Sequence, residues 1–315
     1  MKSPLVSIGI VSFNNDSYIA ECIESCLRQT YSNIEIIIAD DASTDSSVEI
    51  INDYAKKYPL KIRTVLSKEN TGISANFNKA VRESNGEWFK IIACDDVLLP
   101  KCIEDYINAV RNLNIKSGIL FSHLQSFTNN HHINAINKTP DYFNLGYAQR
   151  VQSILVKNTL PTPTAFFNLA TLQELGLADE NYPFLEDYPL WVKATINNVN
   201  MYYIENITVK YRIHDSLSQS VEKIGNIKFY ESLLDFSRAK VWNKRSGIDR
   251  LKNIDDYISL KKMIFSIRVF SNKRSFTYSL FSLIVKPIKP YLIMSQALKL
   301  SGMNVLFKKI NLPKK

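Results

Sequence analysis

Residues 88–97 read WFKIIACDDV, a hydrophobic run that ends in two adjacent aspartates, Asp95 and Asp96. A similar run, IEIIIADD, occupies residues 34–41 and ends in Asp40 and Asp41. Short β-branched runs of this kind predict buried strands of a parallel sheet, and ligands of open α/β folds bind at the carboxyl ends of such strands. Paired carboxylates at that position need a cation, a sugar hydroxyl or water as a partner. The two runs therefore predict an α/β fold with a ligand site at one edge of its sheet.

The rest of the chain alternates strand-like and helix-like patterns around these runs. The strand-like segments are rich in β-branched residues, and the helix-like segments have apolar residues three and four positions apart. Such alternation predicts βαβ units. We expect strands at 6–11, 34–39, 62–66, 87–93, 118–125 and 200–213, the last interrupted near Asn206, and helices at 17–29, 46–57, 73–83, 101–113, 148–157 and 187–197. Residues 126–164 otherwise read as a long polar loop, and two or three helices are expected after residue 213.

Positive charge is concentrated at the C-terminal end. The 315 residues include 39 Lys or Arg and 30 Asp or Glu, a formal net charge of +9. The 59 residues after Asp256 contain 12 Lys or Arg and no acidic residue, so the preceding part has a net charge of −3. Cations mixed with large apolar side chains are typical of helices that lie on an anionic membrane surface. No apolar stretch has the length of about 20 residues that spans a bilayer.

The cysteines and the first residues indicate the compartment. Cys22 and Cys26 lie one helical turn apart beside apolar residues, and neither Cys94 nor Cys102 completes a spacing typical of zinc sites. We expect buried, reduced thiols on the helix at 17–29. The chain starts with a strand-like segment rather than a signal-peptide pattern. These features predict a cytoplasmic protein.

Several short motifs occur in a characteristic order. They are VSIGIVSFN at 6–14, QTY at 29–31, EIIIADDASTD at 35–45, NTG at 70–72, CDD at 94–96 and ED at 186–187. In this order the motifs resemble the family 2 glycosyltransferases, inverting enzymes with a GT-A fold, over roughly residues 4–215. The resemblance implies a Rossmann-like, mostly parallel sheet flanked by helices, followed here by a helical, basic C-terminal region.

The resemblance also implies a donor site for a nucleotide sugar, with a UDP-sugar expected. Val11, Phe13 and Asn14 would form one wall of the nucleoside pocket. Asp41 would accept a hydrogen bond from the base, and Asp95 would contact the ribose. Asp40 could instead support the loop or cap the helix that follows it.

The remaining site residues are assigned in the same way. Asp96 would bind a divalent metal, Mn²⁺ or Mg²⁺, and His214 would lie near the metal or the diphosphate. Asp187 would be the general base of an inverting transfer. For Asp187 the alternative is a simple helix cap, and for His214 a solvated strand face.

Other motifs are missing from the sequence. No Gly-x-Gly-x-x-Gly follows the first strand and no Gly-x-x-x-x-Gly-Lys-Ser/Thr occurs, which argues against dinucleotide dehydrogenases and P-loop enzymes. The processive signature Gln-x-x-Arg-Trp is also missing, which favours the addition of one sugar per encounter.

These features together predict a glycosyltransferase that uses a lipid-linked saccharide acceptor in the assembly of a surface polysaccharide, O-antigen or capsule. It would be peripheral at the inner face of the cell membrane. Residues 1–220 would be catalytic, with a nucleotide-binding half over about 1–100 and an acceptor half over about 101–220, and residues 221–315 would associate with the membrane. Two alternatives stay open: a transferase acting on a protein or a soluble glycan, and a non-catalytic module that binds membranes or nucleic acid. We expect no nucleic-acid partner.

Overall fold

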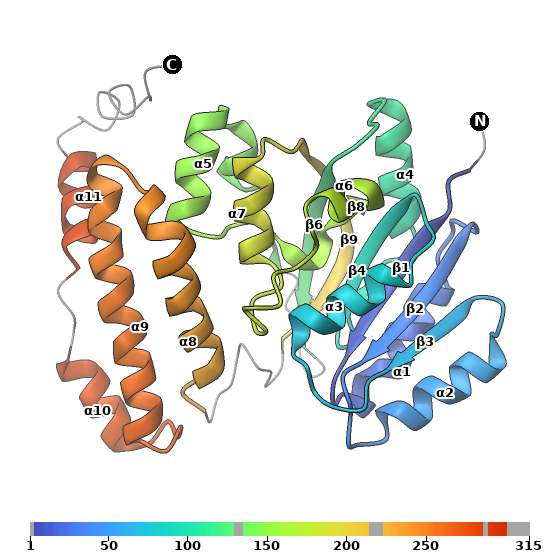
Figure 1. Ribbon diagram of the computed structural model, residues 1–315, viewed down its shortest axis with the longest axis horizontal. Coiled ribbons are helices and arrows are strands. Elements are labelled where there is room, and N and C mark those ends of the chain that lie inside the picture. The colour runs from blue at the N-terminus through green and yellow to red at the C-terminus, as the bar shows by residue number, and fades with distance from the viewer. Residues whose placement is uncertain (1–2, 129–134, 214–222, 286–288, 301–315) are drawn as a thin grey trace. The chain divides into compact units, whose positions relative to one another are not determined.

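The computed structural model describes residues 3–128, 135–213, 223–285 and 289–300 (Figure 1). The chain separates into two compact units. The first contains residues 1–144 and 159–213, and the second contains residues 145–158 and 214–315.

The first unit is built on a sheet of nine strands within the described residues. Strands β3, β2, β1 and β4 lie side by side in that order and all pair in parallel. The strands are β1 (Val6–Ser12), β2 (Ile34–Asp40), β3 (Ile62–Leu66), β4 (Trp88–Ala93), β5 (Val97–Leu98), β6 (Ile119–Phe127), β7 (Ala135–Ile136), β8 (Phe166–Asn168) and β9 (Met201–Arg212). The α/β fold with a mostly parallel sheet is confirmed.

Antiparallel strands extend the sheet beyond β4. The short strand β8 runs antiparallel between β4 and β6, and β5 pairs antiparallel with the end of β9. Neither β5 nor β8 was expected from the sequence, because two or three residues show no periodicity. The long strand β9 is continuous, so the expected interruption of this strand near Asn206 is wrong. Its register with β6 instead shifts between Phe121 and Leu124, opposite the segment that contains Asn206.

Helices cover both faces of this sheet. They are α1 (Asp16–Leu27), α2 (Ser47–Lys57), α3 (Ile73–Arg82), α4 (Cys102–Asn112), α6 (Leu169–Glu174) and α7 (Tyr188–Ile196), with 3-10 turns η1 (Asp141–Asn144) and η2 (Thr162–Thr164). Phe77 of α3 meets Phe89 of β4 edge-on, and Trp191 of α7 stacks on Phe167 of β8. Alternate strand residues point to opposite faces of a sheet. These contacts therefore place α3 and α7 on one face, and α1 and α4, which pack with Trp88 and Ile92, on the other.

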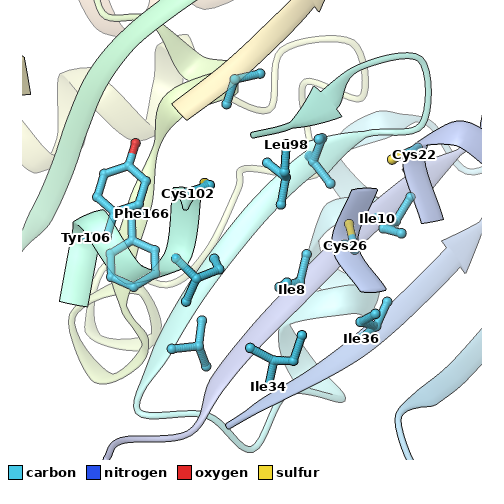
Figure 2. Packing of buried hydrophobic residues seen from close by; sticks show 14 of the residues in the cluster. Ile8, Ile10, Cys22, Cys26, Ile34, Ile36, Leu98, Cys102, Tyr106 and Phe166 are labelled. Atoms are coloured by element: carbon cyan, nitrogen blue, oxygen red, sulfur yellow. The ribbon is translucent and has the colours of Figure 1, made fainter. Parts of the chain in front are cut away.

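The main hydrophobic core lies under that second set of helices. Figure 2 shows Ile8 and Ile10 of β1 beside Cys22 and Cys26 of α1, with Tyr106 of α4 near Phe166 of β8. The rings of Tyr106 and Phe166 stack with centroids 4.6 Å apart. Cys22 and Cys26 are buried and free, as expected, and so are Cys94 and Cys102.

The second unit is helical. It contains α5 (Tyr147–Val156), α8 (Ile227–Phe236), a π-helical turn η3 (Ser237–Val241), the 3-10 turns η4 (Trp242–Lys244) and η5 (Gly247–Arg250), α9 (Leu251–Val269), α10 (Phe276–Ile284) and α11 (Pro290–Leu300). A small core joins Leu234 of α8 to Leu260 and Ile264 of α9. The buried Arg245 donates to the Leu155 carbonyl of α5 and forms an ion pair with Asp256. The helix α5 thus belongs to the C-terminal helices by its contacts.

None of the described helices combines the length and the apolar character that crossing a bilayer requires.

Candidate functional site

The carboxyl ends of β1, β2 and β4 are neighbours in the sheet. The Asp41 N–H donates to the Ser12 carbonyl at 3.0 Å, and the Cys94 N–H donates to the Val11 carbonyl at 3.0 Å. The loops that follow the three strands therefore leave the sheet side by side. We refer to this part of the molecule as the carboxyl edge. Val11 is buried there, and Phe13 is partly exposed.

The loop after β1 is tied to the loop after β2. The Asn14 N–H donates to Ser43 Oγ at 2.8 Å, and Asn14 Oδ1 accepts from the Thr44 N–H at 2.8 Å. Asn14 and Ala42 have φ values of 50° and 65°, a left-handed conformation that costs a non-glycine residue some backbone strain. Asn14 thus shapes the turn that presents Phe13.

The two aspartates that end β2 have different structural roles. Asp40 is fully buried and accepts from the Ser43 N–H at 2.8 Å and from Ser43 Oγ at 2.6 Å. Asp40 therefore supports its own loop. Asp41, 2% exposed, turns toward another segment: it accepts from both the N–H and the hydroxyl of Thr71 and from the Gly72 N–H at 2.8 Å.

The turn held by Asp41 requires glycine at its second position. Gly72 has a φ of 89°, and a Cβ there would lie 2.6 Å from the Pro183 carbonyl oxygen. Lys79 of α3 reaches Thr71 Oγ1 at 2.8 Å and lies 3.4 Å from Asp41. Asp41 thus orders the start of α3 in the protein itself.

The acidic pair Asp95–Asp96 follows β4. Asp96 is 2% exposed, and its Oδ1 accepts from the Arg212 N–H at 2.9 Å. Burial, and then repulsion from the neighbouring Asp95, raise the pKa of Asp96 well above its ordinary value. Asp95 is partly exposed. A buried carboxylate beside a second one is a place where an added cation would be stabilising.

Arg212, at the end of β9, clamps this pair. Its guanidinium lies between the rings of Tyr18 and Phe127, 4.6 Å and 4.4 Å from their centroids. Its Nε donates to the Asp95 carbonyl at 2.8 Å, and it forms an ion pair with Glu21 of α1. The sequence gave no sign of these contacts of Arg212, because its partners come from three segments far apart in the chain.

A divalent cation fits the residues at this edge. Asp95 and Asp96 supply carboxylate oxygens, the ligands that Mg²⁺ and Mn²⁺ prefer. The predicted ligand His214 lies outside the described residues. In the part of the chain that the structure describes, no three or more His, Cys, Asp or Glu side chains gather as a metal cluster.

Asp187 lies immediately before α7 and caps it. Its side chain accepts from the Tyr188 N–H, and its Oδ2 accepts from Thr162 Oγ1 at 2.8 Å. The capping role considered for Asp187 is therefore present. Glu186 is partly buried beside it, and desolvation, followed by repulsion from Asp187, raises the pKa of Glu186.

The loop before Asp187 is joined to the turn held by Asp41. Ser74 Oγ donates to the Tyr182 carbonyl at 2.8 Å, and the Ser74 N–H reaches the Pro183 carbonyl at 3.4 Å. On its other side, Asp187 contacts the turn η2, which leads into β8. Because β8 runs antiparallel to β4 and its first residue, Phe166, pairs with Lys90, the turn η2 lies toward the carboxyl end of β4. The structure thus brings Asp187 to the edge that also has Asp41 and Asp96.

A family model described as glycosyl transferase family 2 matches residues 7–169. A protein of Rickettsia prowazekii named as an uncharacterized glycosyltransferase is 30% identical over 236 residues, which cover 73% of this chain and 70% of that protein. A similarly named protein of Methanocaldococcus jannaschii is 29% identical over 68% of this chain and 72% of its own length.

Two solved structures have a similar fold. TarS residues 1–349 of S. aureus, in complex with UDP-GlcNAc, superposes with a TM-score of 0.60 at 18% identity, covering 84% of this chain and 76% of that one. The mannosyltransferase PcManGT of Pyrobaculum calidifontis, in complex with GDP-Man and Mn²⁺, gives a TM-score of 0.55 at 15% identity, covering 96% and 81%.

Proposed function

The chain belongs to glycosyltransferase family 2, and on that premise we propose that it moves one sugar from a UDP-sugar to a lipid-linked saccharide in surface polysaccharide biosynthesis, O-antigen or capsule. The observation that carries the proposal is the convergence of Asp41, Asp96 and Asp187 on one carboxyl edge through hydrogen-bonded loops. In this proposal Asp41 serves the sugar donor, Asp96 the cation and Asp187 the acceptor hydroxyl.

The donor would lie over the ends of β1, β2 and β4. We assign Val11, Phe13 and Asn14 to one wall of the nucleoside pocket, Asp95 to the ribose and Asp41 to the base. Asp41 already accepts several protein hydrogen bonds, so its contact with the base would share an oxygen with the turn at Gly72. TarS and PcManGT bind a UDP-sugar and a GDP-sugar, and both kinds of donor are therefore compatible with this type of fold.

In the proposed reaction an acceptor hydroxyl oxygen attacks the anomeric carbon of the donor sugar. The bond between that carbon and the diphosphate oxygen breaks, and its electron pair leaves with the nucleoside diphosphate. Asp187 takes the proton of the attacking hydroxyl. Attack from the face opposite the leaving group inverts the anomeric centre.

A divalent metal would be held by Asp96, with His214 proposed as a further contact to the metal or the diphosphate. When bound, Mn²⁺ or Mg²⁺ neutralises negative charge that develops on the leaving diphosphate. Arg212 holds the loop of Asp95 and Asp96 in place through its N–H and Nε hydrogen bonds. The protein's own part is thus to fix the two carboxylates at the end of β4.

The lipid-linked acceptor and the membrane partner are proposed from the second unit. One side of α10 packs on α9 through Tyr278 and Phe281, which contact Phe270. The opposite side exposes a stripe of large apolar residues with one-turn spacing: Phe276, Leu280, Leu283 and Ile284. An exposed apolar stripe in a region with basic residues and no acidic ones after Asp256 suits an anionic lipid surface, and we propose residues 221–315 as the membrane-associated part.

Vesicle binding tests the membrane proposal. We expect the protein to bind vesicles that contain anionic lipid, to bind neutral vesicles weakly, and to dissociate as salt increases. Each basic residue near the surface contributes about 1 kcal/mol before screening by salt, so changing four lysines to Gln should weaken binding by up to about 10³-fold at low salt. The four are Lys286, Lys289, Lys308 and Lys309. Sedimentation with vesicles at several salt concentrations measures the effect.

A second variant separates the apolar stripe from the charge. Changing Leu283 and Ile284 to Ser should also weaken binding, whereas the matched control that changes the exposed Leu60 and Leu113 of the first unit should not. Turnover of a short water-soluble acceptor should persist in all variants. Equal binding to neutral and anionic vesicles at every salt concentration would contradict the membrane proposal.

A nucleotide-release screen tests the transferase proposal as a whole. UDP-Gal, UDP-GalNAc, UDP-Glc, UDP-GlcNAc and GDP-Man would each be offered with a synthetic lipid-diphosphate-sugar acceptor. We expect release with one UDP-sugar that depends on the acceptor. Release with GDP-Man alone would overturn the UDP assignment, and transfer only to a protein or a free glycan would favour the alternative acceptor.

A further inference from the structure

Two buried side chains, Lys90 and Tyr106, hold the turn η2 by hydrogen bonds to its carbonyls. Lys90 of β4 is fully buried, and its ammonium donates to the carbonyls of Ile91, Pro163 and Ala165 at 2.8, 2.6 and 3.4 Å. The hydroxyl of the buried Tyr106 donates to the Thr164 carbonyl, between the two carbonyls that Lys90 takes. Three successive carbonyls thus have side-chain donors, which leaves this turn little freedom to move.

Thr162 is the first residue of this turn. It contacts Trp191 of α7 and Asp187, the residue that caps α7. The Trp191 indole N–H donates to Thr162 Oγ1 at 3.2 Å, and Thr162 Oγ1 donates to Asp187 Oδ2 at 2.8 Å. An indole nitrogen can only donate, so the threonine oxygen is its acceptor and the hydroxyl proton is directed at the carboxylate. Trp191 itself is immobilised in the core between Phe167 and Phe121.

We propose that Thr162 is a positioning residue that orients Asp187 for proton abstraction, with Trp191 setting the direction of its hydroxyl. The inference rests on the proposed role of Asp187 and deepens it. The Tyr188 N–H holds one carboxylate oxygen and Thr162 holds the other, so the carboxylate plane is fixed before the acceptor binds. Pre-fixed geometry of this kind lowers the barrier of a proton transfer without contact between Thr162 and substrate.

Among the described residues, titratable groups near this contact include Glu186 beside Asp187, and Lys90 and Tyr106, which donate to carbonyls of the turn. The pKa of Glu186 is raised, and burial lowers the pKa of Lys90 to about 8. These three residues stay the same in every Thr162 variant, so a difference in rate between the variants reports the hydroxyl of residue 162.

The test compares Thr162→Val, which keeps the shape and removes the hydroxyl, with Thr162→Ser, which keeps the hydroxyl. Single-turnover rates are measured with saturating donor. We expect Thr162→Val to lower the rate by about 10- to 100-fold. Donor affinity should stay close to the wild-type value, and Thr162→Ser should restore the rate. Should the valine variant fail to fold, Thr162→Ala replaces it in the comparison with serine.

Asp187→Asn, measured in parallel, separates the two hypotheses. If Asp187→Asn retains the full rate, the assigned base is wrong and the inference falls with it. If Asp187→Asn loses the rate but Thr162→Val matches the wild type in rate, the inference alone is wrong. Equal losses in the valine and serine variants would also overturn it, because only the hydroxyl is proposed to act.

Discussion

Replacing Asp187 by Asn is expected to lower the single-turnover rate of sugar transfer by about 10²- to 10⁴-fold, the usual range for the loss of a general base. The amide has no basic site for the acceptor proton, but it can still accept the hydrogen bond from the Tyr188 N–H that caps α7. The helix should therefore persist, and the dissociation constant of the donor should stay close to the wild-type value. The single-turnover rate is measured from product formed in quenched samples, and the dissociation constant of the donor is measured by titration calorimetry.

Asp53→Asn is the matched control for this change. Asp53 is exposed on α2, and its ion pair with Lys56 is also exposed, so the same chemical change there should leave rate and affinity unaltered. A collapse of donor affinity in Asp187→Asn would instead assign Asp187 to the donor site. Wild-type turnover would remove it from the mechanism altogether.

Replacing Asp96 by Asn should abolish metal-dependent transfer. The metal supplies several kcal/mol of charge stabilisation to the leaving diphosphate, and a loss of about 3 kcal/mol corresponds to about 10²-fold in rate. Chelation with EDTA should have the same effect on the wild type, and added Mn²⁺ or Mg²⁺ should reverse it. The fold should tolerate the change, because Asn replaces a buried carboxylate whose charged form is already disfavoured.

Thermal melts separate loss of metal from loss of fold. In the wild type, the metal–UDP complex at about 100 times its dissociation constant should stabilise the protein by about 2.7 kcal/mol, whereas Asp96→Asn should melt at the apo temperature with or without it. Asp53→Asn again provides the control and should respond like the wild type. Full activity in EDTA, or a metal response that survives in Asp96→Asn, would contradict the assigned ligand.

The first hundred residues were predictable from the sequence because each element there has a local signal. The strand at 62–66 agrees with β3 (Ile62–Leu66), and the helix expected at 46–57 differs from α2 (Ser47–Lys57) by one residue. A buried parallel strand is a continuous apolar run, and a helix that covers the sheet has one apolar face. Burial therefore determines the hydrophobic pattern that can be recognised in the sequence. The same holds for the aspartate pairs, because two adjacent carboxylates after an apolar run usually mark the end of a buried strand.

The elements that the sequence did not indicate depend on neighbours far along the chain. The three residues of β8 form a strand because β4 and β6 offer hydrogen-bonding edges on either side. A buried lysine on β4 contradicts the usual expectation for a core position. It is stable there because three carbonyls accept from its ammonium.

The sequence by itself determined the α/β fold, the order of the N-terminal elements, the acidic ends of β2 and β4 and the basic C-terminal region. Only the tertiary structure decided which groups meet at those ends: Arg212 against Asp95 and Asp96, Asp41 against the turn at Gly72, and Thr162 against Asp187. The physical reason is the range of the interactions. Periodicity and strand ends are set by residues a few positions apart, whereas a hydrogen bond between loops exists only after the sheet has brought distant segments within about 3 Å.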